Sequence, residues 1–405
     1  MPLKTKCFKA IFLLSPDRCD TLNIQNMEWS FGMKYFEYPD KKQCIAAISK
    51  SILHHYDMET ENPTYPPLDA RLENVPRNIV LLLLDGLGQN ILISHLPEDS
   101  FLRRHQTDTL SSVFPPTTTA AATALETGLF PSQSGWLGWN IFWPPIGQNV
   151  ALYPNTMEDG KQAADYHIGD RCLHVTTLAE KIREMAGISA FSLSEQGAKT
   201  MEDVCTAVSR LCKEEGRHFI YGYVNEPDHS LHGLGCKAEE VRQWLQEADR
   251  QLEDLQKACP DTLFILTADH GFTDVEARCL EDYPELEETL LRKPSIEPRA
   301  LNLFLKPGKE AEFLRLWKAT MGDSYDLYTK EQVLSQELFG PSPNHGMLEQ
   351  MLGDYLAVAR TPLTLFPNPS YLKFMKATHG GMTPEELTVP LILWNGMEET
   401  GNSDK

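Results

Sequence analysis

Four short apolar runs, separated by helical patterns, constrain the fold of this chain more than any other feature. They are residues 78–84, 188–193, 218–224 and 262–267. Continuous β-prone runs of this length are typical of strands that are buried on both faces of a parallel sheet. Strands that alternate with helices form sheets whose two faces are both covered. The sequence therefore predicts an α/β fold with a mostly parallel central sheet and helices on each side of it.

The segments between these runs carry helix signals. Thr177 is placed to cap a helix that Gly187 would end. Apolar residues from Val241 to Leu255 recur at helical spacing, and Pro260 follows them. These segments are expected to supply helices that cover the predicted sheet.

The sequence changes character between residues 292 and 369. A strand over 301–305, a helix over 310–321 and a strand over 355–359 are expected there, between turn-rich pieces. We interpret this part as a small α+β cap inserted over the edge of the sheet, and the apolar run at 389–394 as a return to the main sheet. The predicted parts of the chain are an N-terminal extension at 1–32, a core at 33–291, the cap at 292–369 and a return to the core with a C-terminal tail at 370–405.

The charge of the chain limits the kind of partner that it can bind. The formal net charge is −20, and no cluster of Lys and Arg interrupts the acidic background. A surface that follows a nucleic-acid polymer needs such clusters to displace counterions, so we expect no nucleic-acid polymer as a partner. A small phosphorylated substrate remains compatible with this charge, because bound metal ions can supply positive charge locally.

The cysteine pattern and the hydropathy give an expectation about the compartment. Nine cysteines are scattered without a CxxC pair, which is typical of reduced thiols in a cytoplasm. No segment is apolar for long enough to span a bilayer. The short apolar stretch within residues 4–15 lacks a small-residue cleavage site after it, so a signal peptide is disfavoured and a cytoplasmic protein is expected.

Polar residues with metal-binding chemistry follow three of the four runs. Asp85 follows the first, Asp228 and His232 the third, and Asp269 and His270 the fourth. Both residue types are costly to bury without a partner, and both are good zinc ligands. In open α/β sheets, ligands bind beyond the carboxyl ends of the strands. We therefore expect these side chains to converge on one site.

Two further places add a hydroxyl and a third imidazole. Thr117, Thr118 and Thr119 precede a small-residue segment suited to a helix start, whose free N–H groups would stabilise an anion. His379 is followed by two glycines, which let the backbone approach a crowded site. An isolated threonine would be an ordinary helix cap, and a lone histidine an ordinary core or surface residue. Together, however, three carboxylates, three imidazoles and a hydroxyl form a ligand set for two cations such as zinc, with positions open for substrate oxygens.

The order of these motifs resembles that of the alkaline phosphatase superfamily, and specifically its nucleotide pyrophosphatase/phosphodiesterase branch. The resemblance extends over most of the chain, from about residue 78 to 395. The matching motifs are Asp85-Gly86, FPPTTTAAATALETGLFPSQSGWLGW at 114–139, EPDHSLHG at 226–233, TADHG at 267–271 and HGGMTPEE at 379–386.

The resemblance implies a role for each matched residue. Thr118 takes the position of the nucleophile, and Asn140, one residue out of step with the family's asparagine, is the candidate for binding a phosphoryl oxygen. His229 lies within a motif but does not match a ligand. The implied ligands of the first zinc are Asp85, Thr118, Asp269 and His270, and those of the second are Asp228, His232 and His379.

The resemblance also implies a reaction. A family member of this kind is a zinc-dependent hydrolase of phosphate esters that acts through a covalent threonyl-phosphoryl intermediate. Phosphodiester or pyrophosphate bonds of nucleotide-type substrates are favoured, because no cationic group for a monoester is evident near the motifs. The alternatives are a phosphonate hydrolase or phosphomonoesterase with the same site, a transferase that passes the phosphoryl group to an alcohol, and an inactive metal-binding scaffold protein.

Overall fold

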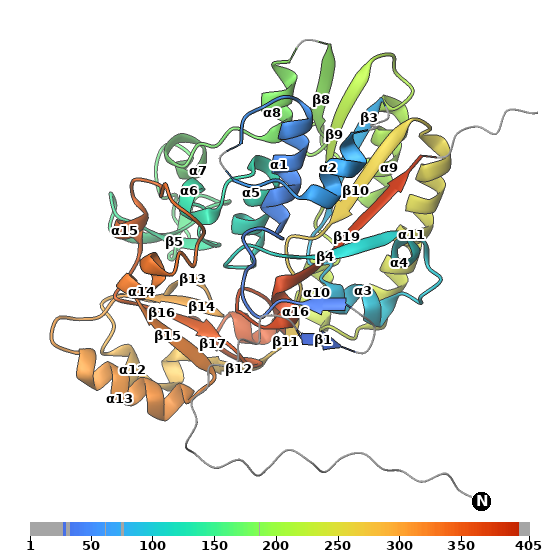
Figure 1. Cartoon of the computed structure of the whole chain (residues 1–405). Helices are drawn as coiled ribbons and strands as arrows, with labels where there is room; N and C mark the ends of the chain where they lie inside the picture. Colours follow the sequence, from blue (N-terminus) through green and yellow to red (C-terminus); the bar gives the residue numbers. More distant parts are fainter. Residues whose placement is uncertain (1–26, 30–32, 61, 74–76, 186, 397–405) are drawn as a thin grey trace, which may run out of the picture.

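The computed structural model describes residues 27–29, 33–60, 62–73, 77–185 and 187–396 of the chain (Figure 1). The apolar stretch within 4–15 lies outside the described residues, as does most of the extension expected at 1–32. Of that extension, β1 (Met27–Trp29) is described, and it pairs with β2 (Met33–Tyr35). In the described part of the chain, no helix has the length and apolar character needed to cross a bilayer.

A six-stranded sheet forms the centre of the fold. Its outer strand β8 is followed by β9, β3 and β10, which run parallel to one another, and then by β19, which is antiparallel to both β10 and β4. The mostly parallel α/β fold is therefore confirmed, and the C-terminal apolar run does return to the main sheet. The strands, in spatial order, are β4 (Gln106–Ser111), β19 (Thr388–Asn395), β10 (Thr262–Thr267), β3 (Asn78–Leu84), β9 (Arg217–Val224) and β8 (Ile188–Ser192).

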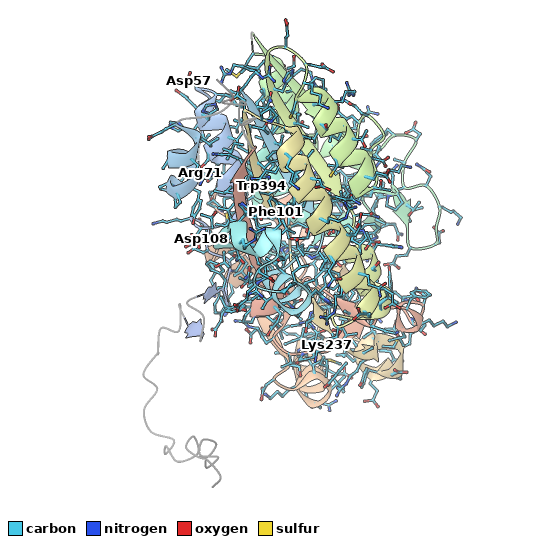
Figure 2. All side chains as sticks on the ribbon, turned by 90° about the vertical axis from the view of Figure 1, so that its right-hand side faces the viewer. Asp57, Arg71, Phe101, Asp108, Lys237 and Trp394 are labelled. Atoms are coloured by element: carbon cyan, nitrogen blue, oxygen red, sulfur yellow. The ribbon has the colours of Figure 1, made fainter. Side chains whose placement is uncertain are left out.

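The central strands are buried along their whole length. All residues of β3 and of β10 are buried, as expected for strands that are covered on both faces. Apolar side chains of these strands and of the flanking helices form one continuous core. Within this core, Trp394 stacks on Phe264 with ring centroids 4.9 Å apart, and the ring centroid of Phe101 lies 5.4 Å from that of Trp394. Figure 2 labels Trp394 and Phe101. This core holds the strand ends in fixed positions.

Helices cover both faces of the sheet. Thr177 caps α8 as expected, because its side chain accepts a hydrogen bond from the backbone N–H of Glu180. Figure 1 shows one group of helices on each side of the sheet, and Figure 2 is turned to face the second group. The first group is α1 (Ile45–His55), α2 (Pro66–Leu72), α5 (Thr118–Thr127) and α8 (Leu178–Arg183), and the second is α3 (Gln89–His95), α4 (Phe101–His105), α9 (Met201–Leu211) and α11 (Glu239–Ala258).

A second, seven-stranded sheet joins two distant parts of the chain. Its strands β13 to β16 come from the segment read as a cap, and β5 to β7 come from the segment after α5. The helix expected over 310–321 is α13 (Glu310–Met321), which packs against this sheet. The strands, in spatial order, are β15 (Tyr325–Thr329), β16 (Tyr355–Ala359), β14 (Ala300–Leu303), β13 (Ser295–Glu297), β5 (Asn140–Trp143), β6 (Gln148–Ala151) and β7 (Thr156–Met157).

Short elements connect the second sheet to the ends of the main strands. β11 (Thr273–Asp274) pairs with β18 (Ala377–Thr378), and β12 (Glu276–Cys279) pairs with β17 (Leu363–Phe366). The remaining helices are α6 (Pro131–Ser134), α7 (Ile168–Cys172), α10 (Asp228–Leu234), α12 (Pro284–Glu287), α14 (Lys330–Ser335), α15 (Leu348–Met351) and α16 (Pro384–Leu387), with the 3₁₀ helices η1 (Leu280–Asp282) and η2 (Tyr371–Lys373).

A buried ion pair links α16 to the turn between β13 and β14 of the second sheet. The guanidinium of Arg299 donates to both carboxylate oxygens of Glu386, at 2.6 and 2.8 Å, and both side chains are fully buried. The third guanidinium nitrogen, Nη1, donates to the carbonyl of Thr361 at 2.9 Å. Because a bidentate pair of this kind fixes direction as well as distance, it holds the loop that precedes α16 in register with the second sheet.

Candidate metal centre and nucleophile

The predicted site residues meet at one edge of the main sheet. Asp85 directly follows β3, and Asp269 and His270 follow β10 after one residue, Ala268. Asp228 is the first residue of α10, which follows β9, and Thr118 is the first residue of α5. Because β3, β9 and β10 are parallel neighbours, their carboxyl ends bring these side chains to the same place.

Thr118, Asp85, Asp269 and His270 form the first group of neighbouring side chains. The Thr118 Oγ1 atom lies 3.3 Å from Asp85 Oδ1 and 3.3 Å from His270 Nε2. His270 Nε2 lies 3.4 Å from Asp85 Oδ1 and 3.5 Å from Asp269 Oδ2. One hydroxyl, two carboxylates and one imidazole therefore converge, which is the first of the two groups expected from the sequence.

The second group is centred on Asp228. Its Oδ1 atom lies 3.5 Å from His232 Nε2 and 3.5 Å from His379 Nε2. The two groups adjoin, since His270 Nε2 is 3.9 Å from Asp228 Oδ1 and the rings of His270 and His379 stack with centroids 3.7 Å apart. The structure thus brings all seven predicted ligand side chains into one cluster.

The spacing of the ligand atoms fits a bound cation better than direct hydrogen bonds. Ligand atoms bound about 2.0–2.2 Å from a tetrahedral zinc lie about 3.3–3.6 Å from one another, whereas N–H···O bonds are usually shorter than about 3.2 Å. Within the described residues, Asp228 Oδ1 and Asp269 Oδ2 are buried and have no hydrogen-bond partner. Buried oxygens without a partner are rare in native proteins, so these two are the atoms that a cation would satisfy.

The three imidazoles are oriented by backbone carbonyls. The Nδ1 atom of His232 lies 3.0 Å from the Ala377 carbonyl oxygen, and the Nδ1 atom of His379 lies 3.1 Å from the Pro116 carbonyl oxygen. The Nδ1 atom of His270 lies 3.2 Å from the Gly271 carbonyl oxygen. A carbonyl can only accept, so each Nδ1 carries the proton and each Nε2 presents its lone pair to the cluster.

Burial keeps these imidazoles neutral. It lowers the pKa of His232 to about 4 and that of His270 to about 3. Burial also lowers the pKa of His379 well below its ordinary value, and the neighbouring imidazoles add to this effect. A neutral imidazole is the form that binds a metal. The three side chains are thus available as ligands at neutral pH.

The carboxylates show the opposite perturbation. Burial raises the pKa of Asp85 and Asp228, and the nearby charge of Asp269 raises both further. Burial also raises the pKa of Asp269 to about 6. Hydrogen bonds offset part of this cost: Tyr223 donates to Asp85 at 2.5 Å, and the backbone N–H of Gly86 donates to Asp269 at 3.0 Å. Three acidic side chains gathered around His270 need positive charge, which a divalent cation would supply.

The structure separates Thr118 from its two threonine neighbours. Thr117 is the N-cap of α5, and its hydroxyl donates to Glu297 at 2.7 Å. Thr119 is fully buried. Thr118 is half-buried, faces Asp85 and lies at the positive end of the helix, where a developing alkoxide would be stabilised. Of the three hydroxyls, that of Thr118 has the position required of a nucleophile.

A cavity of about 900 Å³ opens from this cluster toward the second sheet. Thr118, Asp228, His232 and His379 line it together with residues of β5, β13 and the loop before β18. Asn140 lines the same cavity and forms a hydrogen bond with Tyr371. The remaining histidine of the third motif, His229, is exposed on α10 and is not part of the cluster.

Three residues of the site were not anticipated from the sequence. Tyr223, which donates to Asp85, is one of several aromatic residues in β9 and carries no separate signal. Glu297 and Lys293 line the cavity but lie in the segment that was read only as a cap. The positions of these two residues depend on how the second sheet packs on the first, and no local sequence pattern predicts that packing.

Comparison with known proteins places the chain in a family. The model of the type I phosphodiesterase/nucleotide pyrophosphatase family matches residues 79–382, which is most of the chain. The protein therefore belongs to this family. No curated protein matches it significantly by sequence.

Solved structures share the fold. One is murine ectonucleotide pyrophosphatase/phosphodiesterase 5 in an inactive form in complex with AMP, with 17% sequence identity, a TM-score of 0.60, and coverage of 78% of this chain and 88% of that one. Another is phosphonoacetate hydrolase from Sinorhizobium meliloti 1021 in complex with phosphonoacetate, with 17% identity, a TM-score of 0.57, and coverage of 81% and 92%. At this identity the likeness concerns the fold.

Proposed function

We propose that the protein is a zinc-dependent hydrolase of phosphodiester or pyrophosphate bonds, with nucleotide-type substrates favoured, that acts through a covalent threonyl-phosphoryl intermediate. One observation carries the proposal: the Thr118 hydroxyl, at the N-terminus of α5, lies 3.3 Å from both Asp85 Oδ1 and His270 Nε2. Family membership and the AMP complex of the murine neighbour support the substrate class.

The ligand sets follow the two groups of side chains. Asp85, Thr118, Asp269 and His270 would hold one zinc ion, and Asp228, His232 and His379 the other. When bound, the ions would lower the pKa of the Thr118 hydroxyl and offset the negative charge of the reacting phosphoryl group.

Side chains and backbone groups of the protein position the reacting atoms. The Thr118 hydroxyl gives up its proton to solvent and its oxygen attacks phosphorus, while the bond from phosphorus to the leaving oxygen breaks. Water then attacks the same phosphorus, the bond from phosphorus to Thr118 breaks, and the threonine oxygen takes up a proton again. The N-terminal N–H groups of α5 stabilise negative charge beside the attacking oxygen. Asn140, which lines the same cavity, would donate its amide N–H to a non-bridging phosphoryl oxygen.

A comparison of three substrates tests this function. The zinc-loaded protein is expected to hydrolyse bis-p-nitrophenyl phosphate with a kcat/KM at least about tenfold above that for p-nitrophenyl phosphate, because Lys293, the lysine or arginine that lines the cavity among the described residues, is paired with Glu281 and does not compensate the extra charge of the monoester. Phosphonoacetate serves as the third substrate, since one structural neighbour binds it. Preferential release of phosphate from phosphonoacetate would instead identify a phosphonate hydrolase. No turnover of any of the three would favour an inactive metal-binding protein.

A further inference from the structure

A further carboxylate, that of Glu297, lines the cavity together with the predicted metal ligands. Glu297 ends β13 and is 9% exposed. Its Oε1 atom accepts hydrogen bonds from the Thr117 hydroxyl at 2.7 Å and from the Trp139 backbone N–H at 2.9 Å. The carboxylate is thereby fixed to the residue next to Thr118, and it lines the same cavity.

This carboxylate has no cationic partner among the described residues. The nearest arginine in sequence, Arg299, is bound by Glu386 at 2.6 Å. Lys293, which also lines the cavity, lies 3.6 Å from Glu281. Burial raises the pKa of Glu297 to about 7. A buried, uncompensated carboxylate is costly, and it persists only where the surrounding structure holds it.

The backbone around Glu297 is built to hold it there. Ile296 has a φ of +77°, which a β-branched residue rarely adopts. Gly138 packs so closely on it that an added Cβ would lie 2.9 Å from the Ile296 side chain. At Gly380, with a φ of +108°, an added Cβ would lie 3.0 Å from Glu297 Cβ. Strained backbone held by close glycine contacts is characteristic of functional sites.

The charge of the cavity beyond the metal ligands is negative. Its other charged lining residues are Glu158, Asp159, Glu297 and Lys293. Asp159 is paired with Lys161 at 2.6 Å, so Glu297 is the buried charge that a substrate meets beside Thr118. A buried carboxylate that lines a cavity disfavours additional negative charge on a group bound there.

We propose that Glu297 is a specificity-determining residue that rejects substrates carrying more than one negative charge on the reacting phosphorus. The site then takes diesters of phosphate or pyrophosphate, whose reacting phosphorus carries a single negative charge, and it discriminates against dianionic monoesters. This inference rests on the proposed function and narrows its substrate class. We assign this role to Glu297 because its side chain contacts Thr117, the residue before the proposed nucleophile.

The variant Glu297→Gln tests the charge without changing the shape. The amide oxygen of glutamine can accept both hydrogen bonds that Oε1 now accepts, so only the charge is lost. At pH 9, above the pKa of Glu297, kcat/KM for p-nitrophenyl phosphate is expected to rise about tenfold relative to that for bis-p-nitrophenyl phosphate. Glu331→Gln, an exposed position on α14, is the control for net charge and should leave the ratio unchanged. An unchanged ratio in Glu297→Gln would overturn the proposal.

A binding measurement separates this inference from the proposed hydrolysis. Isothermal titration of the zinc-loaded protein with phenylphosphonate, a dianion, and methyl phenylphosphonate, a monoanion, needs no turnover. In Glu297→Gln, the Kd of the dianion is expected to fall about tenfold more than that of the monoanion. If that variant does not fold, Glu297→Met must shift the preference in the same direction. Equal changes for both ligands would refute the role of Glu297, whereas failure of the native protein to bind either ligand would overturn the proposed zinc site on which the inference rests.

Discussion

The variant Thr118→Ala is expected to hydrolyse bis-p-nitrophenyl phosphate on the order of 10³-fold or more slowly than the native protein, because it lacks the attacking oxygen. The Asp85 and His270 side chains that face this oxygen remain in place in the variant. Steady-state kcat, measured at equal zinc content, gives the comparison. Thr118→Ser, which keeps a hydroxyl, is expected to retain part of the activity.

Neighbouring hydroxyls provide the matched control for this assignment. Thr119 is fully buried, and its hydroxyl has no hydrogen-bond partner within the described residues. Thr119→Val replaces that hydroxyl with a methyl group of similar shape, and we expect kcat within about tenfold of the native value, since no hydrogen bond is lost. Undiminished hydrolysis in Thr118→Ala, or a greater loss in Thr119→Val, would show that the nucleophile has been assigned wrongly.

Removal of the metal ions is expected to abolish turnover and to destabilise the protein. Without cations, the carboxylates of Asp85, Asp228 and Asp269 are buried beside one another, and burial and mutual repulsion raise the pKa values of Asp85 and Asp228. Ligand binding to the folded state alone contributes about 4 kcal/mol when free zinc is a thousand times its Kd. Dialysis against a chelator, followed by activity assay and thermal unfolding, measures both effects.

The return of zinc is the control for this experiment. Activity and Tm should both recover when zinc is added back, since the imidazoles are held in place by backbone carbonyls and not by the metal. A protein that elemental analysis shows to be metal-free, and that still hydrolyses the diester at the native rate, would rule out metal-dependent catalysis. Recovery of Tm without recovery of activity would indicate a structural metal only.

The main sheet and its site residues could be predicted because their signals are local. A strand buried on both faces is a continuous apolar run, and β3 and β10 have the predicted limits. Parallel strands bring their carboxyl ends together, so Asp85 and Asp269 were expected to meet although they are far apart in sequence. The periodicity of a helix likewise separates His232, which faces Asp228, from the exposed His229.

The second sheet was not predictable in the same way. Its strands alternate with turns, and nothing in such a segment specifies that Ile296 pairs with Asn140, which lies in a distant part of the chain. The contact between Glu297 and Thr117 follows from this pairing and from the positive φ of Ile296, which its residue type disfavours. The positions of the residues that shape the cavity therefore depend on long-range packing. The metal ligands at the ends of the main strands, in contrast, could be predicted from the strands that they follow.

Anomalous diffraction at the zinc absorption edge, from crystals of the zinc-loaded protein, tests the central claim most directly. The account predicts two peaks beside the Thr118 hydroxyl, one bounded by Asp85, Asp269 and His270 and the other by Asp228, His232 and His379. Absence of density at this cluster, or zinc bound only elsewhere on the protein, would contradict it.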